Sequence, residues 1–130
     1  MRTLREEILA CADAQVRTLD EGRGYELTFH FGKDFTGFQG HFPGHPVLPA
    51  FVQVLVGQCA LCIRSARGWR LRQIDRSKFL KTILPDQCVT VCWQERPQDA
   101  RVRCSFTLLV NGEKAATFTL EFDVEESCHA

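Results

Sequence analysis

Apolar and polar residues alternate along this chain with two different periods, and each period predicts a different kind of element. Residues 3–13 place apolar side chains at helical spacing behind a capping-box pattern, which predicts a short amphipathic helix. Residues 25–31 alternate strictly, as is typical of a half-buried strand, and residues 14–20 alternate weakly. The glycine-containing turn between these two runs predicts a hairpin, with His30 on its solvated face.

The apolar run over residues 50–63 predicts a long helix that is buried on nearly all sides. A proline can begin a helix and a glycine can end one, so we expect the helix to span residues 49–66 and to end at Gly68. Apolar side chains surround it, and Gln53 and Gln58 are the polar side chains that interrupt them before Arg64. Such a helix requires other elements to wrap around it.

The C-terminal half contains four alternating segments that predict the strands of this wrapper. They are residues 71–83, 87–94, 101–110 and 114–124, joined by short turn signals at residues 84–86, 96–99 and 111–112. We expect antiparallel neighbours in a meander, and a single α+β domain over residues 1–130, in which a curved sheet of five to six strands wraps one central helix. One sheet face does not cover such a helix completely, so we also expect a dimer in which a second sheet continues the first.

The charge balance and the N-terminal segment exclude several classes of protein. Sixteen basic and sixteen acidic residues cancel, so net charge does not point to nucleic acid or to an anionic membrane. No apolar run reaches the roughly 20 residues that span a bilayer. The first residues carry carboxylates and no signal-peptide segment follows them, so a cytoplasmic protein is expected.

Seven cysteines are many for 130 residues, but their number is odd and their spacing does not suit a metal site. Cys59 and Cys62 form a CxxC pair without a suitable second pair, and the pair falls inside the predicted helix rather than at its start. We expect no disulfides, no metal and no cofactor. The cysteines are interpreted as buried, reduced thiols that pack as small hydrophobic side chains; they are Cys11, Cys59, Cys62, Cys88, Cys92, Cys104 and Cys128.

Residues 40–49, directly before the long helix, carry the most specific motif of the chain. They read Gly-His-Phe-Pro-Gly-His-Pro-Val-Leu-Pro, an irregular loop that contains two histidines. This string resembles the active-site signature of the hot-dog-fold β-hydroxyacyl-[acyl-carrier-protein] dehydratases of fatty acid synthesis. Residues 78–87 are similar to the second characteristic segment of that family, and Val52-Gln53 resembles the related dehydratases of aryl polyene biosynthesis.

This resemblance implies a hot-dog fold and a dehydration site. Eliminating water from a 3-hydroxyacyl thioester requires a base for the C2 proton and an acid for the leaving C3 hydroxyl, and a histidine titrates in the right range for the base. The family pattern places the base on His41 and the carbonyl that orients its imidazole on Val47. It assigns the thioester oxygen to the backbone N–H of Ala50, where the family usually has glycine.

The acid that the family requires is missing from this sequence. In the family it lies on the helix fourteen positions after the histidine, a position that Leu55 occupies here between two valines. Gln53 is the nearest polar side chain, and an amide positions a hydroxyl or water but does not donate a catalytic proton. His45 in the same loop is the other candidate.

Three interpretations remain open from the sequence. The protein is an active dehydratase that uses Gln53, His45 or water; it is one subunit of a heterodimer whose partner supplies the carboxylate; or it is an acyl-thioester binding module or a thioesterase. A thioesterase of this fold needs a carboxylate to activate water or attack the carbonyl, and Asp34 is the acidic residue in the loop before residues 40–49. A purely structural role for the loop is the remaining alternative.

The resemblance also implies an apolar acyl channel and an acyl thioester partner. Phe42 and Phe51, with Phe38 and Leu48, are the candidates for lining the channel. The acyl group is expected on acyl carrier protein or on coenzyme A. The basic segment 64–81 suits an acidic carrier protein, although a solvated face has the same composition.

Overall fold

The computed structural model describes residues 2–13, 15–38 and 44–125, which form an antiparallel sheet and two α-helices. Within these residues, neither helix combines the length and the apolar character needed to cross a membrane. The elements in chain order are α1 (Leu4–Ala10), β1 (Arg17–Leu19), β2 (Gly24–His30), α2 (Ala50–Ser65), β3 (Trp69–Phe79), β4 (Cys88–Gln98), β5 (Arg101–Val110) and β6 (Glu113–Val124), with short 3-10 turns at Asp20–Gly22 and Thr36–Phe38.

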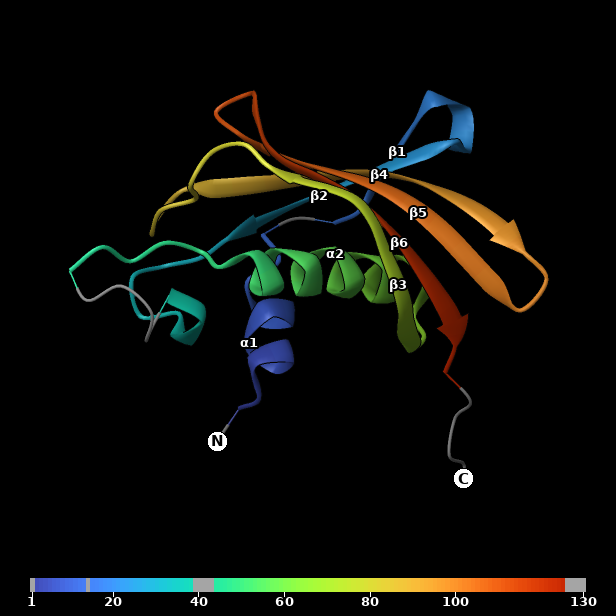
Figure 1. The fold of residues 1–130 in the computed structure, drawn as a ribbon, viewed down its shortest axis with the longest axis horizontal. Helices are drawn as coiled ribbons and strands as arrows, with labels where there is room; N and C mark the ends of the chain where they lie inside the picture. The colour runs from blue at the N-terminus through green and yellow to red at the C-terminus, as the bar shows by residue number, and fades with distance from the viewer. Residues whose placement is uncertain (1, 14, 39–43, 126–130) are drawn as a thin grey trace.

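The six strands form one sheet in the order β1-β2-β4-β5-β6-β3, which arches over α2 (Figure 1). Helix α1 packs against α2 on the side away from the sheet (Figure 1). Its predicted start is confirmed, because Thr3 and Glu6 form a reciprocal capping box. The predicted α+β class, the β1–β2 hairpin and the β4–β5–β6 meander are also confirmed.

The predicted strand over residues 71–83 is wrong in its length and in its neighbour. β3 ends at Phe79 and pairs with β6, so it forms an edge of the sheet and does not lie beside β4. Alternation indicates a strand but not its partner, and the turn signal near residue 85 belongs to a crossing connection. That connection is held by the backbone, with Asp86 N–H donating to the Phe31 carbonyl at 2.8 Å.

Helix α2 is the centre of the core, as its composition predicts. Its side chains from Val52 to Leu61 are buried except for Leu55, which is half-buried against the core. Gly57 allows close packing, because a Cβ there would lie 3.0 Å from Phe118 on β6. The helix ends at Ser65, one residue before the predicted end at residue 66, and Ala66 caps it in the left-handed conformation at φ 55°.

The far end of α2 is fixed by one largely buried ion pair. Arg64 donates from Nε and Nη2 to the two carboxylate oxygens of Glu95 at 2.7 and 2.6 Å. Trp93 Nε1 donates to the same carboxylate at 3.0 Å, and the guanidinium lies 4.9 Å from the centre of the Tyr25 ring. This pair anchors the helix to β4 on the inner face of the sheet.

Removing the cation from this pair should destabilise the fold. Arg64→Met leaves the Glu95 carboxylate, whose side chain is 10% exposed, without its bidentate donor. Because burial is incomplete, we expect a loss of about 2–3 kcal/mol in the free energy of unfolding, measured in urea. The matched control Arg17→Met removes an exposed pair with Glu26 and should cost less than about 1 kcal/mol. Equal losses in the two variants would refute the anchoring role of Arg64.

The prediction of buried thiols holds for some cysteines and is wrong for one. Cys59 and Cys104 are buried, whereas Cys88 is exposed at the start of β4. Burial raises the pKa of Cys59 to about 12, and it also raises the pKa of Cys62, the other member of the CxxC pair. A redox-active thiol has a lowered pKa, so this pair is structural. Cys128 lies outside the described residues, and those that are described hold no cluster suited to a metal.

These environments predict selective alkylation of the native protein. At pH 8 a thiol with a pKa near 12 is ionised in about one molecule in ten thousand, and burial also blocks access. We expect iodoacetamide to modify Cys88 and to leave Cys59 and Cys104 unmodified until denaturant is added, as read by peptide mass spectrometry. Modification of Cys59 in the folded protein at the rate of Cys88 would contradict this assignment.

Candidate functional site

The loop before α2 is held in place from two sides through one residue, Leu48. Its backbone N–H donates to the carbonyl of Ile83 at 2.8 Å, and its carbonyl accepts from Gln53 Nε2 at 2.9 Å. The first contact joins the two segments on which the family resemblance rests, and the second joins the loop to the first turns of α2. Gly44, at φ 83°, is the position in the described part of this loop that requires glycine.

The start of α2 has a backbone donor that the described residues do not use. The Pro49 carbonyl accepts from Val52 and Gln53 at 3.1 and 3.0 Å, while the N–H of Ala50 has no acceptor among the described residues. Ala50 does not have a positive φ, so alanine fits where the family usually has glycine. Unpaired N–H groups and the helix dipole make this end suited to negative charge.

Gln53 adds a buried polar group directly beside this donor. The side chain is 3% exposed, and its Oε1 has no hydrogen-bond donor among the described residues. An unpaired buried acceptor costs about 1–3 kcal/mol, so such a group in a native fold calls for an explanation. A ligand with an N–H or O–H group is one way to satisfy it.

Two hollows meet at the start of α2 and bring several of the predicted site residues together. A cavity of about 320 Å³ is lined by Val47, Leu48, Pro49, Ala50, Gln53, Phe79, Leu80, Lys81 and Thr82. An apolar groove of about 290 Å³ runs between α2 and β3 and is lined by Ala50, Phe51, Val54, Leu71, Ile74, Ser77 and Phe79. They share Ala50 and Phe79, so the unused backbone donor lies where the two hollows meet.

The predicted site residues fall into three groups. His41 and Phe42 lie outside the described residues. Val47, Ala50 and Gln53 line the same cavity, whereas Phe51 is 60% exposed and lines the apolar groove. Their roles in a site stay predictions from the family resemblance.

The channel residues proposed from sequence are not all beside these hollows. Phe38 is buried against Phe35, with ring centres 5.7 Å apart, and lines neither hollow. Residues 79–82 line the cavity although the sequence did not single them out as site residues. The signal that could have found them was the resemblance of residues 78–87 to the second segment of the family.

Neither hollow contains a carboxylate among its lining residues. Leu55, at the position of the family acid, is half-buried against the core. Asp34 is exposed and His45 is exposed, and neither lines the cavity or the groove. Within the described part of the chain, no carboxylate therefore takes the place of the acid.

The basic segment over residues 64–81 is partly paired within the chain itself. Arg64 is paired with Glu95, Arg67 lies over the Trp69 ring, and Lys81 is paired with Glu113. Arg70 and Arg72 both approach Asp123, at 3.7 and 3.5 Å. Arg67, Arg76 and Lys78 have no ion pair with a described carboxylate, so part of the charge that suits an acidic carrier stays available.

Comparisons with solved structures show which fold this site belongs to. The chain superposes on a chain of the dehydratase heterocomplex ApeI:P from Xenorhabdus doucetiae with a TM-score of 0.67 at 16% identity, covering 84% of this chain and 94% of that one. The PaaI protein of the E. coli phenylacetic acid degradation operon gives 0.63 at 16% identity, covering 92% of both chains. The smu.793 protein of Streptococcus mutans UA159, solved with acetyl CoA, gives 0.65 at 9% identity, covering 87% of this chain and 89% of that one.

The predicted hot-dog fold is confirmed by these superpositions. No curated protein sequence is significantly similar to the chain. The model of the ApeI-like dehydratases, described as ApeI dehydratase, matches residues 17–125, which is most of the sequence. The chain therefore belongs to the ApeI-like dehydratase family.

Proposed function

We propose that this chain supplies the base and the oxyanion-binding half of a hydro-lyase site that removes water from 3-hydroxyacyl thioesters. The observation that carries the proposal is the unused N–H of Ala50, at the start of α2 and at the junction of the cavity and the apolar groove. It is a donor placed where a thioester oxygen gains negative charge. Membership of a dehydratase family supports this chemistry.

In the proposed reaction, the imidazole of His41 takes the C2 proton, oriented by the carbonyl of Val47. The electrons of the C2–H bond move toward the thioester oxygen, where the Ala50 N–H and the helix dipole stabilise the charge. The C2–C3 double bond then forms as the C3–O bond breaks, and the hydroxyl leaves with one proton as water. Gln53 Oε1 accepts a hydrogen bond from the substrate, which satisfies its buried acceptor.

The proton for the leaving hydroxyl is proposed to come from a second subunit. The apolar groove between α2 and the edge strand β3 is the surface on which that subunit would pack, since Ile74 and Phe79 are 47% and 42% exposed there. The dehydratase ApeI:P, with the same fold, is a heterocomplex, which favours a different chain over a second copy. A carboxylate on the partner's helix, at the position that Leu55 occupies in this chain, would complete the site at His41 across the interface.

A thioesterase is the less favoured alternative, because neither hollow is lined by a carboxylate in the described part of the chain. An active homodimer that relies on Gln53 or His45 is the other. Acyl carrier protein or coenzyme A as the carrier, a place in fatty acid synthesis and a cytoplasmic location are parts of this proposal that rest on the sequence.

The proposal predicts a gain of turnover when an acid is restored. We expect the purified chain alone to form no 2-enoyl product from a 3-hydroxyacyl thioester above background. Leu55→Glu places a carboxylic acid at the family position and should raise turnover by about 10²-fold or more, the typical contribution of a general acid. Formation of the conjugated product, followed by its ultraviolet absorbance and by mass spectrometry, is the measurement.

Two histidine variants in the Leu55→Glu background then test the base. His41→Ala should abolish the restored turnover, whereas His45→Ala, which changes an exposed histidine of the same loop, should retain it. Full turnover by the unmodified homodimer, or loss of turnover with His45→Ala instead of His41→Ala, would overturn the proposal. Leu55→Gln is the matched control for the polar substitution, because an amide cannot donate the proton.

A further inference from the structure

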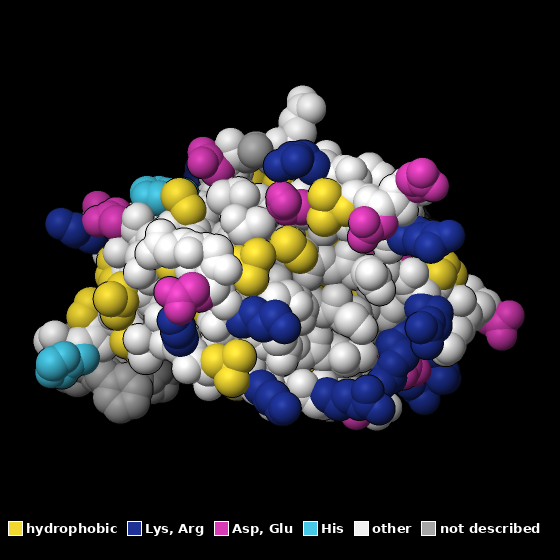
Figure 2. All heavy atoms as spheres, turned by 90° about the horizontal axis from the view of Figure 1, so that it is seen from above, with side chains coloured by type: hydrophobic (Ala, Val, Ile, Leu, Met, Phe, Trp, Pro, Cys, Tyr) yellow, Lys and Arg dark blue, Asp and Glu magenta, His cyan; other side chains and the backbone are white. Residues whose placement is uncertain are grey.

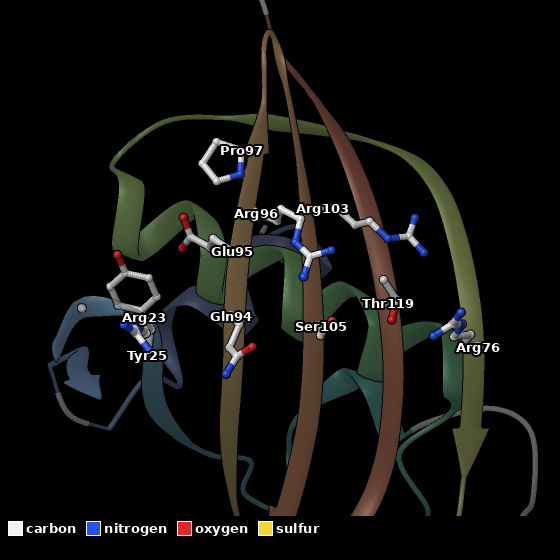
Figure 3. Close-up of a pocket in the computed structure, with 11 residues that line it drawn as sticks. Arg23, Tyr25, Arg76, Gln94, Glu95, Arg96, Pro97, Arg103, Ser105 and Thr119 are labelled. Carbon is white, nitrogen blue, oxygen red and sulfur yellow. The ribbon is translucent and has the colours of Figure 1, made fainter. Parts of the chain in front are cut away.

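A third, polar hollow lies beside β4 and β5 at the start of β2 and extends over the face of the sheet opposite α2. It has a volume of about 610 Å³ and shares no lining residue with the cavity or the apolar groove (Figure 3). Its characteristic lining residues are four arginines and two hydroxyl side chains: Arg23, Arg76, Arg96, Arg103, Ser105 and Thr119. We call this hollow the arginine groove.

The strand register brings these residues together across three neighbouring strands. Arg96 on β4 lies directly opposite Arg103 on β5, and Ser105 lies directly opposite Thr119 on β6. Directly opposed side chains have Cβ atoms about 4.5–5.5 Å apart. The centre of the groove is therefore a compact arrangement of two guanidinium groups and two hydroxyl groups.

The positive charge of the groove is only partly neutralised. Arg103 pairs with Asp75 at 3.1 Å and with Glu121 at 3.2 Å. The guanidinium groups of Arg23, Arg76 and Arg96, in contrast, have no ion pair with any carboxylate that the structure describes. Two like charges in directly opposed positions destabilise a sheet, so Arg96 opposite Arg103 is a feature that folding alone does not favour.

A hydrogen bond from Gln73 lowers the pKa of the Asp75 carboxyl, and the nearby Arg76 guanidinium helps to lower it. The ion pair of Asp75, however, is with Arg103. The other acidic groups near the groove do not correct the excess. Glu95 lines it, but both of its oxygens are bound by Arg64, which lies on the inner side of the sheet. Asp20 lines a smaller adjoining hollow and makes no ion pair in the described residues. Figure 2 shows the result on this face of the sheet, where Lys and Arg side chains gather toward one end.

The spacing of the cations indicates the size of a matching anion. Arg23 directly precedes β2, and Arg76 lies on β3. Each of these strands is two positions from β5 in the sheet, which is a distance of about 10 Å at the usual strand spacing. Arg23 and Arg76 thus border the groove on two sides, with Arg96 and Arg103 between them (Figure 3). Guanidinium groups bind phosphate in a bidentate manner, and hydroxyl groups add neutral donors. A chain of two or three phosphate groups fits this arrangement better than a single anion.

We propose that the arginine groove binds an oligophosphate group, such as the diphosphate or triphosphate of a small molecule, at a site separate from the acyl thioester site. The ligand neutralises Arg23, Arg76 and Arg96 and accepts hydrogen bonds from Ser105 and Thr119. This inference does not depend on the proposed hydro-lyase activity, since the two sites share no residue.

Calorimetric titration with inorganic tripolyphosphate tests the proposal. At a salt concentration of about 0.15 M, where nonspecific attraction is screened, we expect one site for each chain. The double variant Arg23→Gln/Arg96→Gln should weaken binding about tenfold for each arginine, since each loses a charge-assisted contact. Arg23 and Arg96 are exposed, as are the two positions of the control below, so we expect the variants to remain folded; thermal unfolding checks this.

The matched control is Arg17→Gln/Arg67→Gln, which changes the net charge by the same amount at positions outside the groove. Its affinity for tripolyphosphate should equal that of the unmodified chain. Absence of saturable binding, or an equal loss of affinity in the control, would overturn the proposal. Retention of affinity in the Arg23→Gln/Arg96→Gln variant would do the same.

Discussion

The burial of α2 is the constraint on which the rest of the structure depends. A helix with apolar residues around nearly its whole circumference is stable in water only when other elements cover it, and here the arched sheet and α1 share that task. Gly57 brings the helix close to the aromatic side chains of β5 and β6, and the Arg64–Glu95 pair fixes its far end. The loop that leads into its first turn is held to Ile83 through the backbone N–H of Leu48.

The same constraint accounts for the position of the candidate site. Helix ends leave backbone groups unpaired, and at the start of α2 the incoming loop is fixed through Leu48 without using the N–H of Ala50. Packing therefore leaves a preorganised donor at the mouth of an apolar groove. The edge strand β3 borders that groove, so the surface that would accept a second subunit and the surface that would accept an acyl thioester are continuous.

Local patterns in the sequence were sufficient to predict most elements of the fold. The 3.6-residue and two-residue periods gave α1, α2, the first hairpin and the β4–β6 meander, because each depends on neighbours in the chain. The place of β3 depends on a pairing with β6, whose residues lie 37 to 55 positions further along the chain, and alternation does not encode such a partner. The left-handed Ala66 and the exposure of Cys88 are likewise set by tertiary packing.

For the candidate site, the motif over residues 40–49 indicated the chemistry, and the hydrogen bonds of Leu48 and Gln53 could not be foreseen from it. We propose that this chain can activate C2 of a thioester without completing the elimination. Deuterium incorporation at C2 of a 3-hydroxyacyl thioester in D₂O measures that step alone. We expect the unmodified chain to exchange C2 hydrogen without forming the enoyl product, and the exchange to be lost in His41→Ala. Absence of exchange, or exchange that survives this substitution, would contradict the claim.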